Sequence, residues 1–268
     1  MDRNAPIGIF DSGTGGLTVA RAVKDMLPDE DMIYFGDSAH LPYGDKSATT
    51  IQSYSIKITN ALLERGCKVI LIACNSASAA AYELVKEYVG SRAKVYNVID
   101  PVIDLLAQRF VDKKVGLIGT KQTVNSQVFD QKIKQRQIEV SLVSLATPLL
   151  VPMIEEGFIN NSISHEIIAQ YLGDERFEGI EALILGCTHY PIIKDALKDF
   201  YKNEVELIDS ANIVAQNLKQ QLITQDLTRE KNKGNDQFLV SDITPAFEKA
   251  ASLFFNQDIH LEKYPLWE

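Results

Sequence analysis

Two cysteines are the residues of this sequence best suited to chemistry. Cys74 and Cys187 each follow a short apolar run, and hydroxyl, amide or imidazole side chains follow each of them. A lone cysteine of this kind is more often a structural residue. Two cysteines at matching positions, where a strand ends and a helix begins, instead favour a reactive role, because a helix N-terminus stabilises a thiolate. Cys67 precedes a strand, and we expect it to be structural.

Two such thiols can serve as base and acid on opposite faces of one carbon atom. One sulfur removes a proton as a thiolate, the other returns a proton as a thiol, and the roles exchange for the other enantiomer. A free cysteine is only about 3% thiolate at pH 7, so a helix N-terminus or a nearby cation must raise that fraction. Asp11 and His189 are placed to move protons for the two thiols.

Two further loops are candidates for holding an anionic ligand. Residues 10–17 follow a predicted strand and open a helix with three glycines, an acid and hydroxyls, which suits backbone N–H groups approaching an anion. This stretch has neither the Gly-x-Gly-x-x-Gly spacing nor the lysine of a phosphate-binding loop, so a nucleotide site is disfavoured. The turn-rich loop 34–44 could present the N–H groups of Tyr43 and Gly44 to a carboxylate.

The elements that position these residues alternate between apolar strands and amphipathic helices. This alternation predicts an α/β fold with parallel sheets covered on both faces, and ligands at the carboxyl ends of the strands. The predicted strands are residues 7–10, 32–35, 69–73, 95–98, 115–118, 140–143, 182–185, 205–208 and 238–240, and the predicted helices are residues 17–26, 48–65, 78–89, 102–109, 122–136, 162–172, 192–200, 211–222 and 246–255.

A faint internal repeat predicts two similar domains. Residues 7–14 resemble 115–120, and residues 69–76 resemble 182–189, at nearly the same offset. We therefore expect two α/β domains related by pseudo-two-fold symmetry, with the active site in the cleft between them. The polar stretch 224–236 is expected to be a surface loop, and the strand and helix after it should return to the first domain, because they cannot bury a core alone. The expected domains are 1–98 plus 209–268, and 99–208.

The composition excludes several classes of protein. The 268 residues are 46% hydrophobic and 24% charged, which is ordinary for a globular protein. A net charge of −9 without a basic run argues against a nucleic-acid binder. Three cysteines without a Cys-x-x-Cys pattern predict neither disulfides nor a metal site, and so a reduced, cytoplasmic protein. No signal peptide is evident, and the apolar runs are too short to cross a membrane.

Taken together, these motifs resemble the glutamate racemases of the cofactor-independent aspartate/glutamate racemase superfamily. The resemblance covers the chain in order and implies interconversion of L-glutamate and D-glutamate for peptidoglycan synthesis. It implies no cofactor and no metal, a cytoplasmic location, no membrane or nucleic-acid partner, and a homodimer. The segments that carry it are residues 8–17, 37–44, 74–78 and 185–191, extended by 152–157, 207–210 and 241–242.

The resemblance also implies roles for individual residues. Cys74 and Cys187 match the two acid/base thiols, Asp11 and His189 match their assistants, and Asp37 and Glu155 match further acids of the family. Ser76 and Ser78 stand where the family usually has threonine, which keeps the hydroxyl and loses a methyl group. The positions that match substrate-binding residues are Asp11, Ser12, Tyr43, Gly44, Asn75, Ser76, Thr120, Thr188 and His189.

Three alternatives stay open at this point. The first is a racemase of the same superfamily that acts on aspartate or a hydantoin, although the Tyr43–Gly44 loop and residues 187–191 favour glutamate. The second is a two-lobed, non-catalytic binding module for an anionic metabolite. The third is a Cys–His amidohydrolase, which would need one cysteine and could dispense with Cys74. The racemase is expected to incorporate solvent deuterium at Cα.

Overall fold

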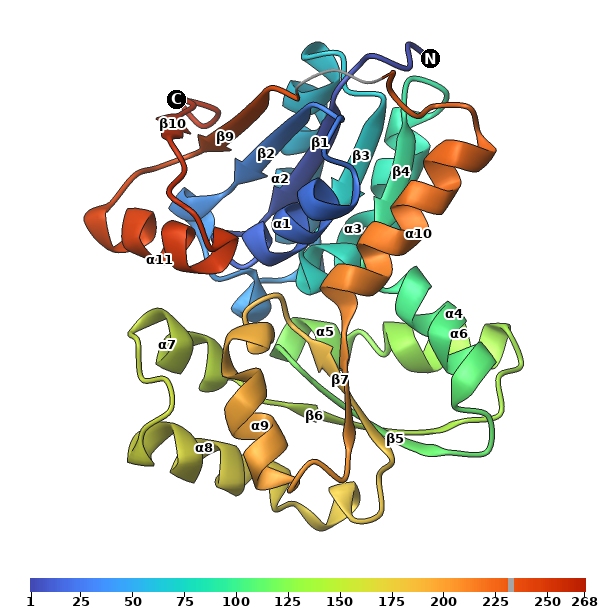
Figure 1. Cartoon of the computed structure of the whole chain (residues 1–268), viewed down its shortest axis with the longest axis vertical. Helices are drawn as coiled ribbons and strands as arrows, with labels where there is room; N and C mark the ends of the chain where they lie inside the picture. The colour runs from blue at the N-terminus through green and yellow to red at the C-terminus, as the bar shows by residue number, and fades with distance from the viewer. Residues whose placement is uncertain (231–233) are drawn as a thin grey trace.

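The computed structural model describes residues 1–230 and 234–268, and its strands form two parallel sheets, one above the other in Figure 1. The larger sheet has the order β10-β9-β2-β1-β3-β4 and the smaller one β6-β5-β7-β8. The predicted α/β class with two parallel sheets is confirmed. The strands are β1 (Ile7–Asp11), β2 (Met32–Gly36), β3 (Val69–Ile72), β4 (Lys94–Asn97), β5 (Lys114–Gly119), β6 (Ser141–Ala146), β7 (Ala182–Gly186), β8 (Glu206–Asp209), β9 (Asp236–Val240) and β10 (Leu261–Lys263).

Helices cover both faces of each sheet. In Figure 1, α1, α10 and α11 lie in front of the larger sheet, and α2 and α3 lie behind it. None of the described helices is long and apolar enough to cross a membrane. The α-helices are α1 (Leu17–Met26), α2 (Ala48–Glu64), α3 (Asn75–Val89), α4 (Asp100–Arg109), α5 (Lys121–Asn125), α6 (Val128–Gln135), α7 (Leu150–Glu155), α8 (Ser162–Leu172), α9 (Lys194–Phe200), α10 (Ser210–Thr224) and α11 (Pro245–Phe255). The short 3-10 helices are η1 (Ser38–His40), η2 (Tyr43–Asp45), η3 (Glu175–Phe177) and η4 (Tyr190–Ile193).

The continuous apolar runs of the strands are explained by this double cover. In β3, Val69 and Leu71 belong to the core packed against α1 and α10, whereas Ile70 and Ile72 belong to the core packed against α2 and α3. Successive side chains of a strand point to opposite faces, so a strand buried on both faces must be apolar at every position. This constraint is why the strands could be located from the sequence.

The smaller sheet repeats the strand order of the larger one. β1 lies between β2 and β3, with β4 next to β3, and β5 lies between β6 and β7, with β8 next to β7. The internal repeat in the sequence therefore corresponds to a repeated arrangement of four strands. Cys67 is buried, and its Sγ lies 3.0 Å from the place that a Cβ on Gly8 would occupy. It packs against the central strand, in agreement with the structural role expected for it.

The chain departs from the prediction in a few places. The predicted helix 122–136 is two helices, because Gln127 adopts a left-handed conformation with φ 53° between them. Helix α7 and strand β10 were not predicted, since α7 is short and contains a proline, and β10 has two exposed charged residues out of three. Within the predicted loop 224–236, the first and last residues belong to α10 and β9, and residues 231–233 lie outside the described residues.

Strand pairing bears on where the chain divides into domains. β9 pairs with β2 and β10 pairs with β9, so the part of the chain after α10 extends the larger sheet. All strands of the smaller sheet lie between Lys114 and Asp209. We propose that residues 1–98 with 209–268 form one domain and residues 99–208 the other, and the strand pairing supports this division.

A buried ion pair connects distant segments at the amino-terminal edge of the larger sheet. Lys68 Nζ lies 2.5 Å from Glu30 Oε2 and donates to the backbone carbonyls of Arg3 and Leu227 at 2.6 and 2.9 Å. The side chains of Lys68 and Glu30 are 0% and 3% exposed. Removing one partner of such a pair leaves an uncompensated charge in the interior, which is strongly destabilising.

We therefore expect Lys68→Met to lower the free energy of unfolding by about 3–5 kcal/mol, measured by urea denaturation. Lys113→Met is the matched control, because the Lys113–Glu181 pair has the same 2.5 Å separation but side chains that are 44% and 48% exposed. The control should cost less than about 1 kcal/mol. Equal losses in the two variants would contradict the importance of the buried pair.

Candidate active site

Most of the residues predicted for the site line a single cavity between the two sheets. It is reached from the carboxyl ends of β1 and β3 in one sheet and of β5 and β7 in the other, as expected for parallel sheets. Both reactive cysteines line this cavity. The predicted residues in its lining are Ser12, Tyr43, Gly44, Cys74, Asn75, Ser76, Thr120, Glu155, Cys187, Thr188 and His189. Gly13, Leu41 and Pro42, from the two predicted ligand loops, also line it, as does Val151, which was not predicted.

On the side of the larger sheet, Cys74 caps helix α3. Its Sγ accepts a hydrogen bond from Ala77 N at 3.5 Å and donates to Ser12 Oγ at 3.7 Å. Burial and, to a smaller extent, the nearby Asp11 carboxylate raise the pKa of the Cys74 thiol to about 12, although the hydrogen bonds of its sulfur with Ala77 N and Ser12 Oγ oppose the rise. Burial therefore opposes the stabilisation of this thiolate that is expected from the helix N-terminus.

On the side of the smaller sheet, three residues form a chain of contacts that begins at Cys187. The Sγ of Cys187 lies 3.7 Å from Nδ1 of His189, and Nε2 of His189 lies 3.0 Å from Oε1 of Glu155 on α7. Burial alone would lower the pKa of His189, but its hydrogen bonds to Cys187 and Glu155 and their negative charge raise it to about 10. At neutral pH His189 is therefore protonated and lies beside the sulfur.

Asp11 lies at the contact between the two halves rather than in the cavity lining. Its carboxylate is fully buried and accepts from Gly13 N at 2.9 Å and from the Thr188 hydroxyl at 3.5 Å. Burial raises the pKa of Asp11, while the positive charge of His189 and backbone hydrogen bonds oppose the rise. Asp11 thus interacts electrostatically with both sides of the cavity, because it also raises the pKa of Cys74.

The glycines of the 10–17 motif allow the two halves to approach closely. A Cβ on Gly15 would lie 2.3 Å from Thr188 Oγ1 and 2.5 Å from His189 Nδ1, so no other residue fits there without a shift. Thr18 Oγ1 also donates to the Thr188 carbonyl at 3.3 Å. This part of the motif brings helix α1 against the Cys187 loop, whereas Ser12 and Gly13 reach the cavity.

Polar contacts also cross the cavity at its other end. Ser76 Oγ and Thr120 Oγ1 are 2.8 Å apart and join the first turns of α3 and α5. Gly44 packs against Thr120, since a Cβ there would lie 2.8 Å from the Thr120 Cβ. The Nδ2 group of Asn75 is buried and has no partner among the described residues, although it lines the cavity. It is a free donor at the N-terminus of α3.

Asp37 is a predicted acid that, like Asp11, lies outside the cavity lining. It is fully buried, is not part of the cavity lining, and receives the Tyr43 hydroxyl on Oδ2 at 2.6 Å. The structure therefore brings Asp37 behind a residue of the cavity rather than into it. No group of three or more His, Cys, Asp or Glu side chains within residues 1–230 and 234–268 could hold a metal ion.

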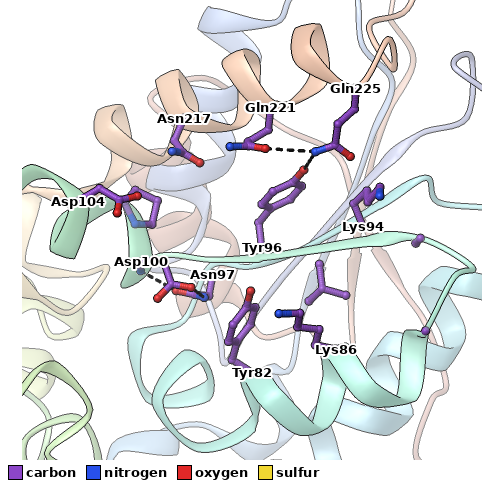
Figure 2. Close-up of a pocket in the computed structure, with 14 residues that line it drawn as sticks. Tyr82, Lys86, Lys94, Tyr96, Asn97, Asp100, Asp104, Asn217, Gln221 and Gln225 are labelled. Carbon is purple, nitrogen blue, oxygen red and sulfur yellow. Dashed lines mark hydrogen bonds between the residues drawn. The ribbon is translucent and has the colours of Figure 1, made fainter. Parts of the chain in front are cut away.

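A second cavity lies between α3, β4, α4 and α10 (Figure 2). Its contacts include Gln225 Nε2, which donates to the Tyr96 hydroxyl at 2.8 Å and to Gln221 Oε1 at 3.1 Å. Among the described residues that line it, none is a cysteine or a histidine, so it lacks the acid/base groups of the cysteine cavity. Its labelled side chains are Tyr82, Lys86, Lys94, Tyr96, Asn97, Asp100, Asp104, Asn217, Gln221 and Gln225.

Comparison with known proteins places this architecture among racemases. Residues 17–218 match the family model described as Asp/Glu/Hydantoin racemase. The chain is 40% identical over 249 residues to a glutamate racemase of Geobacter metallireducens, covering 92% of each chain. It is 38% identical over 260 residues to a glutamate racemase of Persephonella marina, covering 97% of each.

Solved structures give the same result. Glutamate racemase from Francisella tularensis, crystallised in complex with D-glutamate, has a TM-score of 0.92 and 36% identity over 99% of each chain. Glutamate racemase from Thermus thermophilus, in complex with beta-chloro-D-alanine, has a TM-score of 0.87 and 36% identity over 98% of each chain. With its paired cysteines in one cavity and these relatives along nearly its whole length, the chain belongs to the Asp/Glu/hydantoin racemase family.

Proposed function

We propose that this protein interconverts L-glutamate and D-glutamate by moving the Cα proton between Cys74 and Cys187. One observation carries the proposal: thiols from two different sheets line the same cavity. Glutamate is the proposed substrate because the relatives from Geobacter and Persephonella are named glutamate racemases and the Francisella enzyme was crystallised with D-glutamate.

The cavity offers donors suited to a carboxylate substrate. The unpartnered Nδ2 of Asn75 and the backbone N–H groups of Asn75 and Ser76, at the start of α3, are available to an anion, and the helix dipole adds to their attraction. Hydroxyls of Ser76, Thr120 and Thr188 lie in the same lining. Because the chain carries a net charge of −9, such local donors must overcome an unfavourable overall field. We propose that they hold the substrate carboxylates, together with Ser12 and the Tyr43–Gly44 loop.

In the proposed reaction, one sulfur acts as a thiolate and takes the proton from Cα, leaving the bonding electron pair on the substrate. The other sulfur acts as a thiol and gives its proton to Cα from the opposite face, so the carbon is inverted and the two sulfurs have exchanged protonation states. The Cα–H of an amino acid is a far weaker acid than a thiol, so the donors around the substrate carboxylate must stabilise the developing negative charge.

The neighbours of the two sulfurs suit the exchange of protons between turnovers. Cys74 has a pKa of about 12 and is a thiol at neutral pH, ready to donate. Asp11, whose pKa is raised by burial, is the proposed proton acceptor when Cys74 must act as the base. Nδ1 of His189 lies 3.7 Å from the sulfur of Cys187, and contacts with Cys187 and Glu155 raise the pKa of His189 to about 10.

We also propose that the protein works as a homodimer in the cytoplasm and supplies D-glutamate for peptidoglycan. The support for the dimer and for the role in peptidoglycan synthesis is the family resemblance of the sequence. The support for the cytoplasm is its acidic composition and its three cysteines without a disulfide pattern. Light scattering coupled to size-exclusion chromatography tests the dimer.

Deuterium exchange tests the two-base reaction. In D₂O, the D-glutamate formed from L-glutamate should carry deuterium at Cα while the remaining L-glutamate is still protiated, because different groups remove and supply the proton. Cys74→Ser and Cys187→Ser should each lower the racemisation rate by roughly 100-fold or more, as is usual for loss of an acid/base group. Circular dichroism follows the racemisation and proton NMR follows the exchange.

Cys67→Ser is the matched control, because Cys67 is buried outside the cavity and should leave the rate near that of wild type. Early deuterium in the recovered L-glutamate would rule out the two-base reaction. Release of ammonia that survives Cys74→Ser would indicate an amidohydrolase, and tight binding without exchange would indicate a binding module. Faster racemisation of aspartate than of glutamate would reassign the substrate.

The charge of Glu155 should control the protonation of His189. In Glu155→Gln, burial and the contact with Cys187 remain while the contribution of the carboxylate is lost, so the pKa of His189 should fall below about 10. A raised pKa in the folded state means that the imidazolium stabilises the fold below about pH 6.5 and that this contribution is lost as the pH rises through about 10. In the variant the loss should occur at lower pH.

NMR titration of the four histidine side chains measures this change directly, with His189→Asn identifying the signal. Glu156→Gln is the control, since it removes a carboxylate at the next position and should leave the His189 titration unchanged. A His189 pKa that is the same in Glu155→Gln and wild type would show that the carboxylate does not hold the imidazole charged.

A further inference from the structure

Asp37 collects hydrogen bonds from separate parts of the chain. Its Oδ2 accepts from the Tyr43 hydroxyl at 2.6 Å, and its Oδ1 accepts from Ser241 Oγ and Trp267 Nε1, both at 2.8 Å. Nδ1 of His40 lies 3.0 Å from Oδ1. An ionised carboxylate has only acceptor sites, so it can satisfy all four donors at once. Asp37 thereby links a loop of the cavity to the end of β9 and to Trp267.

The loop that Asp37 holds is the one that carries η1 and η2. On one side, Leu41, Pro42, Tyr43 and Gly44 line the cysteine cavity, and Gly44 packs against Thr120 of the other half. This segment, residues 38–45, is called the substrate loop below. Its Asp45 also forms an exposed ion pair with Lys121 at 3.0 Å.

On its other side, the substrate loop is fastened to two segments that are distant in sequence. Ser38 Oγ donates to the Asp242 carbonyl at 2.6 Å, and Ser241 Oγ accepts from Ala39 N at 2.9 Å. These contacts hold the start of the loop against the residues that follow β9. They leave the part of the loop that bears Tyr43 and Gly44 to be held by other contacts.

Trp267 is connected to that part of the loop through Asp37 and Tyr54. Its ring lies 4.5 Å from the His40 ring and 5.1 Å from the Tyr54 ring of α2, measured between centroids, and Lys57 Nζ lies 4.6 Å from its centroid. Tyr54 in turn lies 5.8 Å from Tyr43. The indole therefore packs on the substrate loop while its N–H bonds to the same carboxylate as Tyr43.

We propose that Asp37 is a positioning residue, whose carboxylate ties the substrate loop to Trp267 so that residues 264–268 hold Tyr43 and Gly44 in place for substrate. This inference rests on the proposed racemase function. Asp37 lies outside the cavity lining, with Tyr43 between the two, and its acceptor sites are engaged by protein donors. The carboxylate thus acts through Tyr43 and not on the substrate.

A loosened loop should affect binding more than the chemical step. When only a fraction of the molecules has a binding-competent loop, the apparent affinity falls by that fraction, and saturating substrate restores the ordered state. Loss of a hydrogen bond to a charged group is large enough to shift such an equilibrium by about tenfold. The expected signature is a higher KM with little change in kcat.

Racemisation kinetics of Trp267→Phe and Asp37→Asn provide the test. Trp267→Phe keeps an aromatic ring, of smaller size, and removes the N–H donor, so it should raise KM for glutamate about tenfold with kcat within about twofold of wild type. Tyr88→Phe is the matched control, because it removes an exposed hydroxyl that donates to Asn60 Oδ1 at 2.8 Å and should leave both constants unchanged. An unchanged KM in Trp267→Phe, or a fall in kcat at unchanged KM in Asp37→Asn, would overturn the proposal.

A double-mutant cycle separates the link from ordinary packing. Tyr43→Phe and Trp267→Phe remove two donors that share Asp37, so their combined effect on KM should be smaller than the product of the single effects. Independent, multiplicative effects would contradict a link through Asp37.

Fluorescence keeps the test separate from the proposed reaction. Trp267 is the chain's one tryptophan, so all indole emission comes from this contact. In Asp37→Asn without substrate, quenching of that emission by acrylamide should increase relative to wild type, and equal quenching would overturn the link. If wild type failed to racemise glutamate, the proposed function would fall, while the quenching would still decide whether Asp37 holds Trp267 on the loop.

Discussion

Everything in this protein depends on bringing two sulfur atoms from different sheets to one cavity. Cys74 follows β3 and Cys187 follows β7, so the carboxyl ends of the two sheets must face each other. Close contacts enforce this arrangement. Gly15 leaves room for Thr188 and His189, and the Ser76 hydroxyl meets the Thr120 hydroxyl across the cavity. A bulkier residue at position 15 would push apart the two halves that carry Cys74 and Cys187.

The two cysteines have different ionisable neighbours on the two sides of the cavity. Next to Cys74 lies a buried carboxylate, Asp11, and both groups have raised pKa values because burial disfavours their charged forms. Next to Cys187 lies the imidazole of His189, whose pKa is raised by its contacts with Cys187 itself and with Glu155. The two sheets share the same arrangement of four strands, but they carry different groups beside their cysteines: a carboxylic acid beside Cys74 and an imidazole beside Cys187. Such a difference suits a reaction in which one sulfur must give a proton while the other takes one.

The larger sheet has an addition that the smaller one lacks in the described chain. Strands β9 and β10 extend it beside β2, and the residues after them reach Asp37 and the substrate loop. This addition has a structural consequence for the cavity. A carboxylate outside the lining connects the edge of the sheet to Tyr43, so residues that follow β10 in the chain contribute to the shape of the site.

The sequence by itself determined the elements and the cavity. Strands buried on both faces must be apolar throughout, which located central strands such as β1, β3 and β7, and the residues at the strand ends pointed to the cavity. It could not locate β10, whose exposed Glu262 and Lys263 carry no apolar pattern, or the break at Gln127, which is a backbone conformation. The raised pKa of Cys74 and the contacts of Asp37 were decided only by the tertiary structure. Burial and hydrogen bonds between distant residues are properties of the assembled fold, whereas periodicity and strand-end positions are local and can be read along the chain.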